Sequence, residues 1–137
     1  MEPESFEGNG VDVRVLVVDD TDHVRKMLAE MMELDGFEVV GTAGSGVEAV
    51  DLAQATHPDV VVMDFKMPEM DGLEAARTIR ASHPDQAIVL YTAYLDAELE
   101  RQAKEAGVAM CVGKIEGLNQ LERHITELCR DLRRDRK

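Results

Sequence analysis

Acidic residues follow two short apolar runs of the sequence, at the point where each run ends. Val15 to Val18 lead into Asp19 and Asp20. Val60 to Met63 lead into Asp64. Carboxylates held close together repel one another when ionised, so such a cluster either has raised pKa values or takes up a cation. Oxygen ligands without His or Cys favour Mg²⁺ or Mn²⁺ over zinc, and one carboxylate can serve as a nucleophile.

A hydroxyl and an amine follow two further apolar runs. Ala87 to Tyr91 end at Thr92, and Val108 to Val112 lead to Lys114. The lysine ammonium is a movable positive charge, and the threonine hydroxyl is a short hydrogen-bond donor. Beside a divalent cation, these two groups are suited to bind the oxygens of a phosphoryl group.

Each of these residues has a plainer interpretation when taken alone. Asp19 or Asp20 is a good N-cap for a helix that follows. Asp71-Gly72 is more typical of a turn and a helix start than of a ligand set. A single lysine such as Lys114 is usually exposed. Suitable groups at all four run ends favour the functional interpretation over these separate explanations.

The four run ends must be brought together by the fold. From Val13 onward, short β-branched runs alternate with helical patterns, which is typical of repeated βα units around a parallel sheet. Five strands alternating with five helices predict an α/β fold, a doubly wound three-layer sandwich with right-handed crossovers and helices on both faces. In such a sheet, ligands bind beyond the carboxyl ends of the strands. We therefore expect the acids, Thr92 and Lys114 to converge at that edge.

The first predicted helix begins near Thr21 or Asp22 and ends at Gly36. Four of its apolar residues have helical spacing and are expected to face the core: Val24, Leu28, Met31 and Leu34. The methionines, Met27 and Met31 among them, are interpreted as core residues. Further helices are predicted over residues 46–56, after Asp71-Gly72, over about 96–106, and over 118–132. The helix near 96–106 has a thin apolar stripe, which predicts weak anchorage to the core.

Composition limits the classes of partner. The chain has 137 residues, enough for one domain with a self-sufficient core. Asp and Glu number 28 against 15 Lys and Arg, a net charge of −13. This balance disfavours nucleic acid and anionic membranes as partners, and it favours proteins and metal ions.

Residues 1–10 are predicted to be a flexible acidic tail, and residues 11–137 to form the domain. No apolar stretch approaches the roughly 18 residues needed to span a bilayer. The first five residues lack the pattern of a signal peptide. Because two cysteines cannot make a disulfide framework, a cytoplasmic location is expected.

Four segments of the chain match a known pattern in order and position. They are Val-Leu-Val-Val-Asp19-Asp20, then Val-Val-Met-Asp64-Phe-Lys-Met-Pro68-Glu-Met-Asp71-Gly72, then Leu-Tyr-Thr92-Ala93, then Val112-Gly113-Lys114. With these segments, the chain resembles the receiver domain of bacterial two-component response regulators from about Val13 to Leu132. The resemblance implies a flavodoxin-like (βα)5 fold with strand order 2-1-3-4-5.

The resemblance also implies a role for each acid. Asp64 would accept a phosphoryl group from a phosphohistidine on a sensor histidine kinase or a histidine phosphotransfer protein. Asp19, Asp20 and Asp64 would hold Mg²⁺, directly or through water, together with the backbone carbonyl of Lys66. The transfer would be in line, with positive charge neutralising the phosphoryl oxygens.

Other residues would sense the phosphoryl group. Lys114 and Thr92 would bind its oxygens, and Ala93 would leave room for it. Thr92 would then move toward the new charge and draw the neighbouring loop and fourth helix with it, as a ligand-driven population shift.

The chain departs from the family pattern near Lys114. Cys111 stands where a switch aromatic is usual, and Ile115 stands where a proline commonly follows the lysine. A cis bond without proline costs about 3 to 4 kcal/mol, so a cis Lys114-Ile115 peptide is not expected. Tyr94 is an aromatic residue close to the site. Together with Thr92, Ala93 and Cys111 it is expected to belong to the switch, without being assigned the role of the missing aromatic.

The resemblance implies protein partners. The fourth helix, fifth strand and fifth helix would form the face that binds a downstream protein or a second copy after phosphorylation, without direct binding of nucleic acid or membrane. The domain would catalyse only its own phosphorylation and dephosphorylation. Three alternatives stay open: the receiver part of a multidomain transcription regulator, a phosphorylation-independent docking module, and a phosphatase of the haloacid-dehalogenase type. The last needs a second acid where Lys66 stands.

Overall fold

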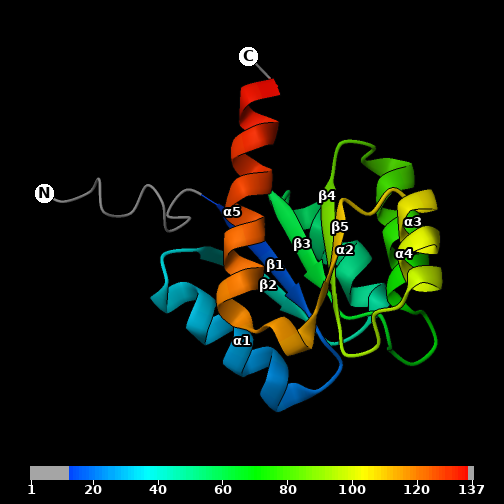
Figure 1. Cartoon of the computed structure of the whole chain (residues 1–137), viewed down its shortest axis with the longest axis horizontal. Coiled ribbons are helices and arrows are strands. Elements are labelled where there is room, and N and C mark those ends of the chain that lie inside the picture. The colour runs from blue at the N-terminus through cyan, green and yellow to red at the C-terminus, as the bar shows by residue number, and fades with distance from the viewer. Residues whose placement is uncertain (1–12, 136–137) are drawn as a thin grey trace, which may run out of the picture.

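Five parallel strands form one sheet in the order β2-β1-β3-β4-β5, as the resemblance implies (Figure 1). The computed structural model describes residues 13–135. The strands are β1 (Arg14–Val18), β2 (Glu38–Ala43), β3 (Val60–Met63), β4 (Ala87–Thr92) and β5 (Met110–Gly113). The helices are α1 (Asp22–Leu34), α2 (Gly46–Thr56), α3 (Gly72–Ser82), α4 (Ala97–Glu105) and α5 (Leu118–Asp135), with the short 3₁₀ helix η2 (Lys114–Glu116) before α5.

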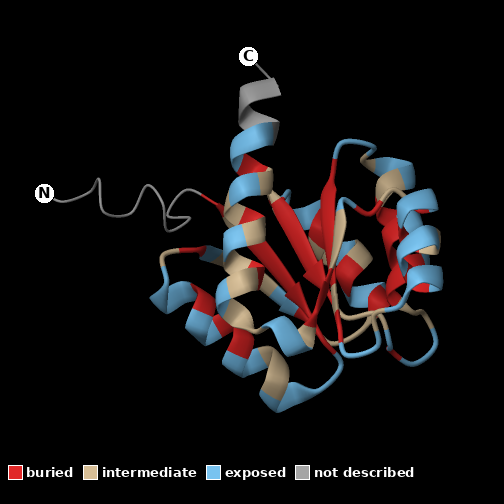
Figure 2. Ribbon diagram, in the orientation of Figure 1, coloured by how far each residue is buried: buried red, intermediate tan, exposed pale blue. Residues whose placement is uncertain are grey.

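Helices cover both faces of the sheet (Figure 1). Helices α1 and α5 lie on one face, and α2, α3 and α4 lie on the other. Side chains of β1 alternate between the two cores: Leu16 and Val18 pack toward α2, α3 and α4, while Val15 and Val17 pack toward α1 and α5. The central strands are therefore buried on both sides (Figure 2). This burial explains why their sequences are unbroken runs of apolar residues.

The register of the central strands sets the position of the first acids. In the pairing of β1 with β3, Val18 lies opposite Met63. Asp64 donates its backbone N–H to the carbonyl oxygen of Val18 over 3.0 Å, and Asp19 donates to Ala43 at the end of β2 over 3.0 Å. The ends of three neighbouring strands are thus tied together at one edge of the sheet.

The buried face of α1 differs from the prediction. Leu28 and Met32 are buried, whereas Met27, Met31 and Leu34 are 54%, 44% and 84% exposed. Successive helical residues are rotated by about 100°, so Leu28 and Met32 share an arc and Met31 lies outside it. Met31 and Met32 are adjacent, and the predicted spacing selected Met31 although Met32 is the buried residue. The interpretation of Met27 and Met31 as core residues is wrong for the same reason.

The other helices agree with the sequence pattern. Helix α2 covers the predicted residues 46–56, and α4 falls within the predicted 96–106. Within α4 only Leu99 and Ala103 are buried, which confirms the thin apolar stripe. The predicted tail at residues 1–10 and the side chain of Leu132 lie outside the described residues, and the domain boundaries stay predictions. Across residues 13–135 the structure has no helix of the length and apolarity that crossing a bilayer requires.

Candidate functional site

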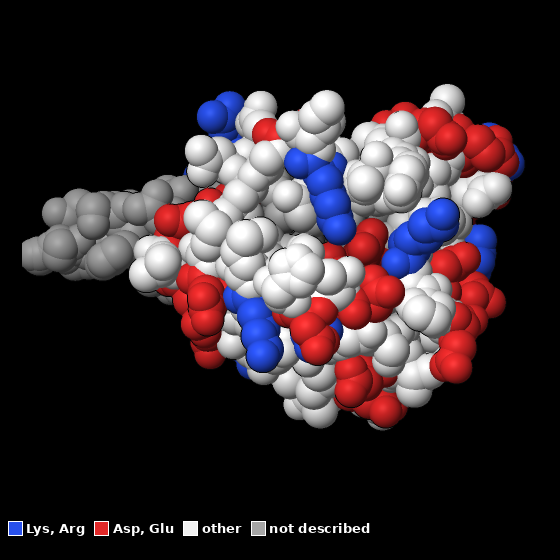
Figure 3. Space-filling model, turned by 90° about the horizontal axis from the view of Figure 1, so that it is seen from below, with Lys and Arg blue, Asp and Glu red and all other residues white. Residues whose placement is uncertain are grey.

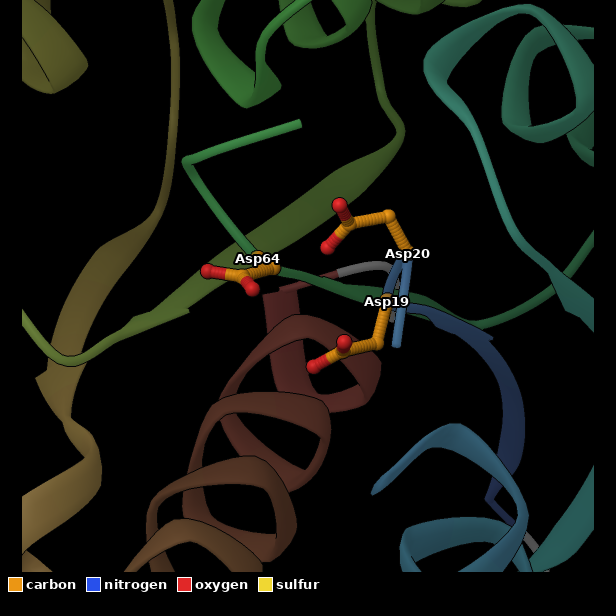
Figure 4. Close-up of side chains that lie close together, drawn as sticks. All are labelled: Asp19, Asp20 and Asp64. Atoms are coloured by element: carbon orange, nitrogen blue, oxygen red, sulfur yellow. The ribbon is translucent and has the colours of Figure 1, made fainter. Parts of the chain in front are cut away.

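Three carboxylates lie together at the carboxyl edge of the sheet (Figure 4). Asp19 and Asp20 directly follow β1, and Asp64 directly follows the neighbouring β3. One oxygen of each side chain lies within 4.8 Å of the others. Asp19 is buried, Asp64 is half-buried and Asp20 is exposed. This all-oxygen set, open to water on one side, fits a hard divalent cation that keeps some of its water ligands.

Asp19 is held firmly in place. Its side chain is 2% exposed, and its Oδ1 accepts a hydrogen bond from the backbone N–H of Thr21 over 2.9 Å. Thr21, and neither acid, is the N-cap residue of α1, so the N-cap interpretation of Asp19 and Asp20 is wrong. Arg25 donates to the carbonyl oxygen of Asp19 over 2.9 Å and thereby braces the loop after β1.

Lys114 directly follows β5, which is two strands along the sheet from β3, and its side chain reaches the acids. Its Nζ lies 3.2 Å from Oδ2 of Asp19 and 3.3 Å from Oδ2 of Asp64. The same Nζ lies 5.7 Å from the centre of the Tyr91 ring. Burial on its own would lower the pKa of Lys114, but Asp64 and Asp19 together raise it above its ordinary value. The side chain is therefore a fixed ammonium between two carboxylates.

The environment of Asp64 disfavours its ionised form. Burial raises the pKa of the Asp64 carboxyl, and the nearby Asp19 carboxylate acts in the same direction. Lys114 and the backbone N–H of Lys66 oppose this effect without cancelling it. A divalent cation at the acids would stabilise the ionised form in the same way as the ammonium.

Thr92 lies at the end of β4, opposite Gly113 in the pairing with β5 and hence beside Lys114. Its side chain is fully buried, and its Oγ1 accepts a hydrogen bond from the backbone N–H of Tyr94 over 3.1 Å. The next residues, Ala93 and Tyr94, are exposed. The predicted convergence of strand-end groups therefore extends to β4 and β5.

The loop between β3 and α3 brings α3 against the backbone of Asp64. Gly72 donates its N–H to the carbonyl oxygen of Phe65 over 2.7 Å. A Cβ at Gly72 would lie 2.5 Å from the carbonyl oxygen of Asp64, so only glycine fits. Asp71 is the N-cap residue of α3 and forms a capping box with Glu74. The interpretation of Asp71-Gly72 as a turn and helix start is thus confirmed.

Charge on the face that contains the site is mixed. Figure 3 views the molecule from the side of these strand ends, and acidic side chains near the centre of that face lie between basic ones. Sequence reasoning missed three basic or aromatic contacts here: Arg25 on Asp19, Lys114 on Tyr91, and Lys66 on Tyr94. Only Arg25 left a signal, because it stands at helical i,i+3 spacing from Asp22, with which it forms a 2.6 Å ion pair.

Comparison with known proteins decides the family. The family model of the response regulator receiver domain matches residues 15–126, which include every residue of the site described above. The chain belongs to the response regulator receiver family.

Relatives of this receiver domain are longer proteins. The transcriptional regulatory protein PdtaR of Mycobacterium tuberculosis (strain ATCC 25618 / H37Rv) is 47% identical over 94 residues, 69% of this chain and 45% of PdtaR. The response regulator GacA of Pseudomonas viridiflava is 43% identical over 110 residues, 80% of this chain and 51% of GacA. The chain therefore spans about half the length of these curated relatives.

Solved structures share the receiver fold. A LuxR-family two-component response regulator from Aurantimonas sp. SI85-9A1 aligns with a TM-score of 0.83 at 32% identity, covering 87% of this chain and 86% of that one. The response regulator domain of Thermotoga maritima CheB aligns with a TM-score of 0.74 at 29% identity, covering 87% and 94%.

Cys111 and Ile115 depart from the usual pattern of receiver domains. Cys111 pairs with Leu90 in the sheet and packs against the core on the side of α2, α3 and α4. Burial raises the pKa of its thiol. Ile115 is 98% exposed, and no peptide bond within the described residues is cis, so the Lys114-Ile115 bond is trans.

Proposed function

We propose that this receiver accepts a phosphoryl group on Asp64 from a phosphohistidine, in a Mg²⁺-dependent reaction, and changes conformation to control a partner protein. One observation carries the proposal. The Asp64 carboxylate is half-buried, lies within 4.8 Å of two further carboxylates, and is 3.3 Å from the Lys114 ammonium. This arrangement has a nucleophile, ligands for a divalent cation and a fixed positive charge in one place.

The transfer would break one bond and form another at phosphorus. A carboxylate oxygen of Asp64 attacks the phosphorus, the P–N bond to the donor imidazole breaks, and its electron pair stays on the imidazole. Mg²⁺, held by Asp19, Asp20, Asp64 and the carbonyl oxygen of Lys66, would supply charge neutralisation at the phosphoryl oxygens. Burial raises the pKa of the Asp64 carboxyl, and the metal would oppose this shift by stabilising the attacking carboxylate.

Lys114 and Thr92 would receive the transferred group. The Lys114 ammonium already lies beside Asp64 and would neutralise the phosphoryl oxygens without a large movement. The Thr92 hydroxyl accepts a hydrogen bond from Tyr94 and keeps its own proton to donate. Ala93 is exposed and small, which leaves room at the entrance.

The conformational change would be carried by α4 and the loop before it. Only Leu99 and Ala103 of α4 are buried, so little apolar contact opposes its displacement. A face formed by α4, β5 and α5 would then bind the downstream protein or a second phosphorylated copy. The donor would be a sensor histidine kinase or a histidine phosphotransfer protein, and we place these events in the cytoplasm, with no direct contact to nucleic acid.

A second candidate is that this receiver acts as the regulatory part of a longer transcription regulator. The length of PdtaR and GacA, about twice the matched region, favours it. Both candidates share the chemistry at Asp64, and the catalysis would be limited to the domain's own phosphorylation and dephosphorylation. Turnover of an added phosphate ester would instead favour the haloacid-dehalogenase alternative.

The test is phosphorylation by a small donor. The protein is incubated with phosphoramidate and Mg²⁺, and intact mass is measured before and after hydroxylamine, which cleaves acyl phosphates. We expect one phosphoryl group on the wild type and on the control variant Asp85→Asn. This variant also replaces an aspartate, one that is exposed in the loop before β4. We expect none on Asp64→Asn or after Mg²⁺ is chelated. An equal adduct on Asp64→Asn would overturn the proposal.

A further inference from the structure

One side-chain contact joins the two loops on either side of the phosphoacceptor. Lys66 stands two residues after Asp64, and its Nζ lies 5.1 Å from the centre of the Tyr94 ring. Tyr94 stands two residues after Thr92 and is 66% exposed. The loop after β3 and the loop after β4 are thus connected by a cation–π contact at the surface.

The backbones of both partners of this contact lie beside residues of the site. The backbone N–H of Lys66 faces the Asp64 carboxyl and acts to lower its pKa. The backbone N–H of Tyr94 donates to Oγ1 of Thr92 over 3.1 Å. Within residues 13–135, Lys66 has no ion pair with an acidic side chain, so the Tyr94 ring is the partner of its ammonium.

We propose that the Lys66–Tyr94 contact is a clasp that opens when Asp64 is phosphorylated. The new phosphoryl dianion draws the Lys66 ammonium from the ring, which frees Tyr94 and the loop that leads into α4. The inference rests on the function proposed for Asp64 and deepens it. It explains how the site could signal in a receiver that has Cys111 in place of the usual switch aromatic.

Magnitudes decide which partner Lys66 prefers. A cation–π contact at an exposed site favours the ring-bound position of the ammonium by about two- to fivefold. Phosphorylation turns the single negative charge of Asp64 into a double one, so the site gains one negative charge beside the metal and Lys114. One charge about 5 Å from an ammonium favours the phosphoryl-bound position by roughly fourfold with the full dielectric screening of water, and by more at the lower effective dielectric near a protein surface. The phosphoryl group therefore wins over the ring, and the Lys66 stem, four methylene groups long, allows the ammonium to turn from one to the other.

Opening the clasp has a defined mechanical consequence. Tyr94 is followed by the half-buried Leu95 and by Asp96, the N-cap residue of α4. Because α4 is anchored by few buried side chains, release of Tyr94 removes one of the contacts that hold its entry loop. The charge change at Asp64 is thereby coupled to the face proposed for the partner.

The first measurement follows the side chain of Lys66 by NMR. Lysine ε-methylene signals are recorded with phosphoramidate and Mg²⁺, and intact mass is measured on the same sample. Before phosphorylation, ring-current shielding should place the Lys66 signal upfield of its position in Tyr94→Leu. On phosphorylation this upfield displacement should be lost, while the signal of Lys26, which is exposed on α1, stays unmoved.

The second measurement is a double-mutant cycle with beryllofluoride, which binds carboxylates as a phosphoryl mimic. Tyr94→Leu should bind the mimic about two- to fivefold more tightly than wild type, because the competing ring is gone. In a Lys66→Gln background the same replacement should have no effect. A merely structural role of Tyr94 would leave its effect intact in that background.

The outcomes separate the inference from the function on which it rests. An adduct on Asp64 with an unmoved Lys66 signal, or a Tyr94→Leu effect that persists without Lys66, would overturn the clasp and leave the function standing. Absence of any adduct would overturn both. A lost upfield displacement together with a vanishing Tyr94→Leu effect would support the clasp.

Discussion

Replacing Glu122 with glutamine is expected to remove a loss of folding stability that the wild type undergoes as the pH rises. Glu122 lies on α5, and its buried Oε2 has no hydrogen-bond partner within residues 13–135. Burial and the facing carboxyl of Asp35 raise the pKa of Glu122 to about 8, from an ordinary value of 4.5. Between these two pH values the folded protein keeps a proton on Glu122 that the unfolded chain releases.

The sign and size of the effect follow from this difference. The unfolded state binds fewer protons than the folded state in this window, so stability falls as the pH rises from 4.5 through about 8. At 1.36 kcal/mol for each pKa unit, the free energy of unfolding would fall by roughly 5 kcal/mol if the group were fully buried. This value is an upper bound. Glu122 retains contact with water, so we expect about 1 to 2 kcal/mol. A neutral glutamine keeps the shape and a donor for Asp35, and it removes this loss.

Urea unfolding of wild type, Glu122→Gln and Glu127→Gln at about pH 5 and about pH 9 measures the effect. Glu127 is exposed on the same helix and serves as the matched control. Glu122→Gln should match wild type near the lower pH and exceed it by about 1 to 2 kcal/mol near the upper one. Glu127→Gln should change little at either pH. An equal difference between Glu122→Gln and wild type at both pH values would refute the reasoning.

Three further replacements test the site. Gly72→Ala puts a methyl group 2.5 Å from the carbonyl oxygen of Asp64, so urea unfolding should show a loss of about 1 to 3 kcal/mol; an unchanged midpoint would contradict the close approach. Asp71→Ala removes the capping box of α3 and should cost about 1 kcal/mol, against almost nothing for the exposed Asp85→Ala. Lys114→Gln removes the cation that lowers the pKa of Asp64, so the pH midpoint of labelling by phosphoramidate should move upward. A midpoint at the wild-type pH would count against that role.

The site could be predicted from the sequence because it depends on topology. Parallel strands buried on both faces read as apolar runs, and Val18 and Met63 end two such runs in register. Whatever follows such runs must lie at one edge of the sheet, which is why Asp19, Asp64 and Lys114 converge as expected.

The orientation of α1 could not be predicted in the same way. Met31 and Met32 have the same chemistry, and the choice between them is made by packing of α1 on the sheet. Local periodicity contains no information about that packing, since the two residues differ only in their angle around the helix.

Contacts between distant segments were also beyond sequence reasoning. Lys66 meets Tyr94, and Glu122 faces Asp35, because of how loops and helices are placed in three dimensions. No motif links either pair along the chain. The roles of Thr92, Ala93, Tyr94 and Cys111 in switching stay predictions for the same reason, since a switch depends on a second conformation.

Mapping the phosphoryl group to a single residue tests the central claim most directly. The protein is labelled with phosphoramidate and Mg²⁺, reduced with borohydride, which converts an aspartyl phosphate into homoserine, and digested for peptide mass spectrometry. We predict homoserine at position 64 alone, with none when Mg²⁺ is chelated. Reduction at another acid, or an equal yield at position 64 without the metal, would contradict the account.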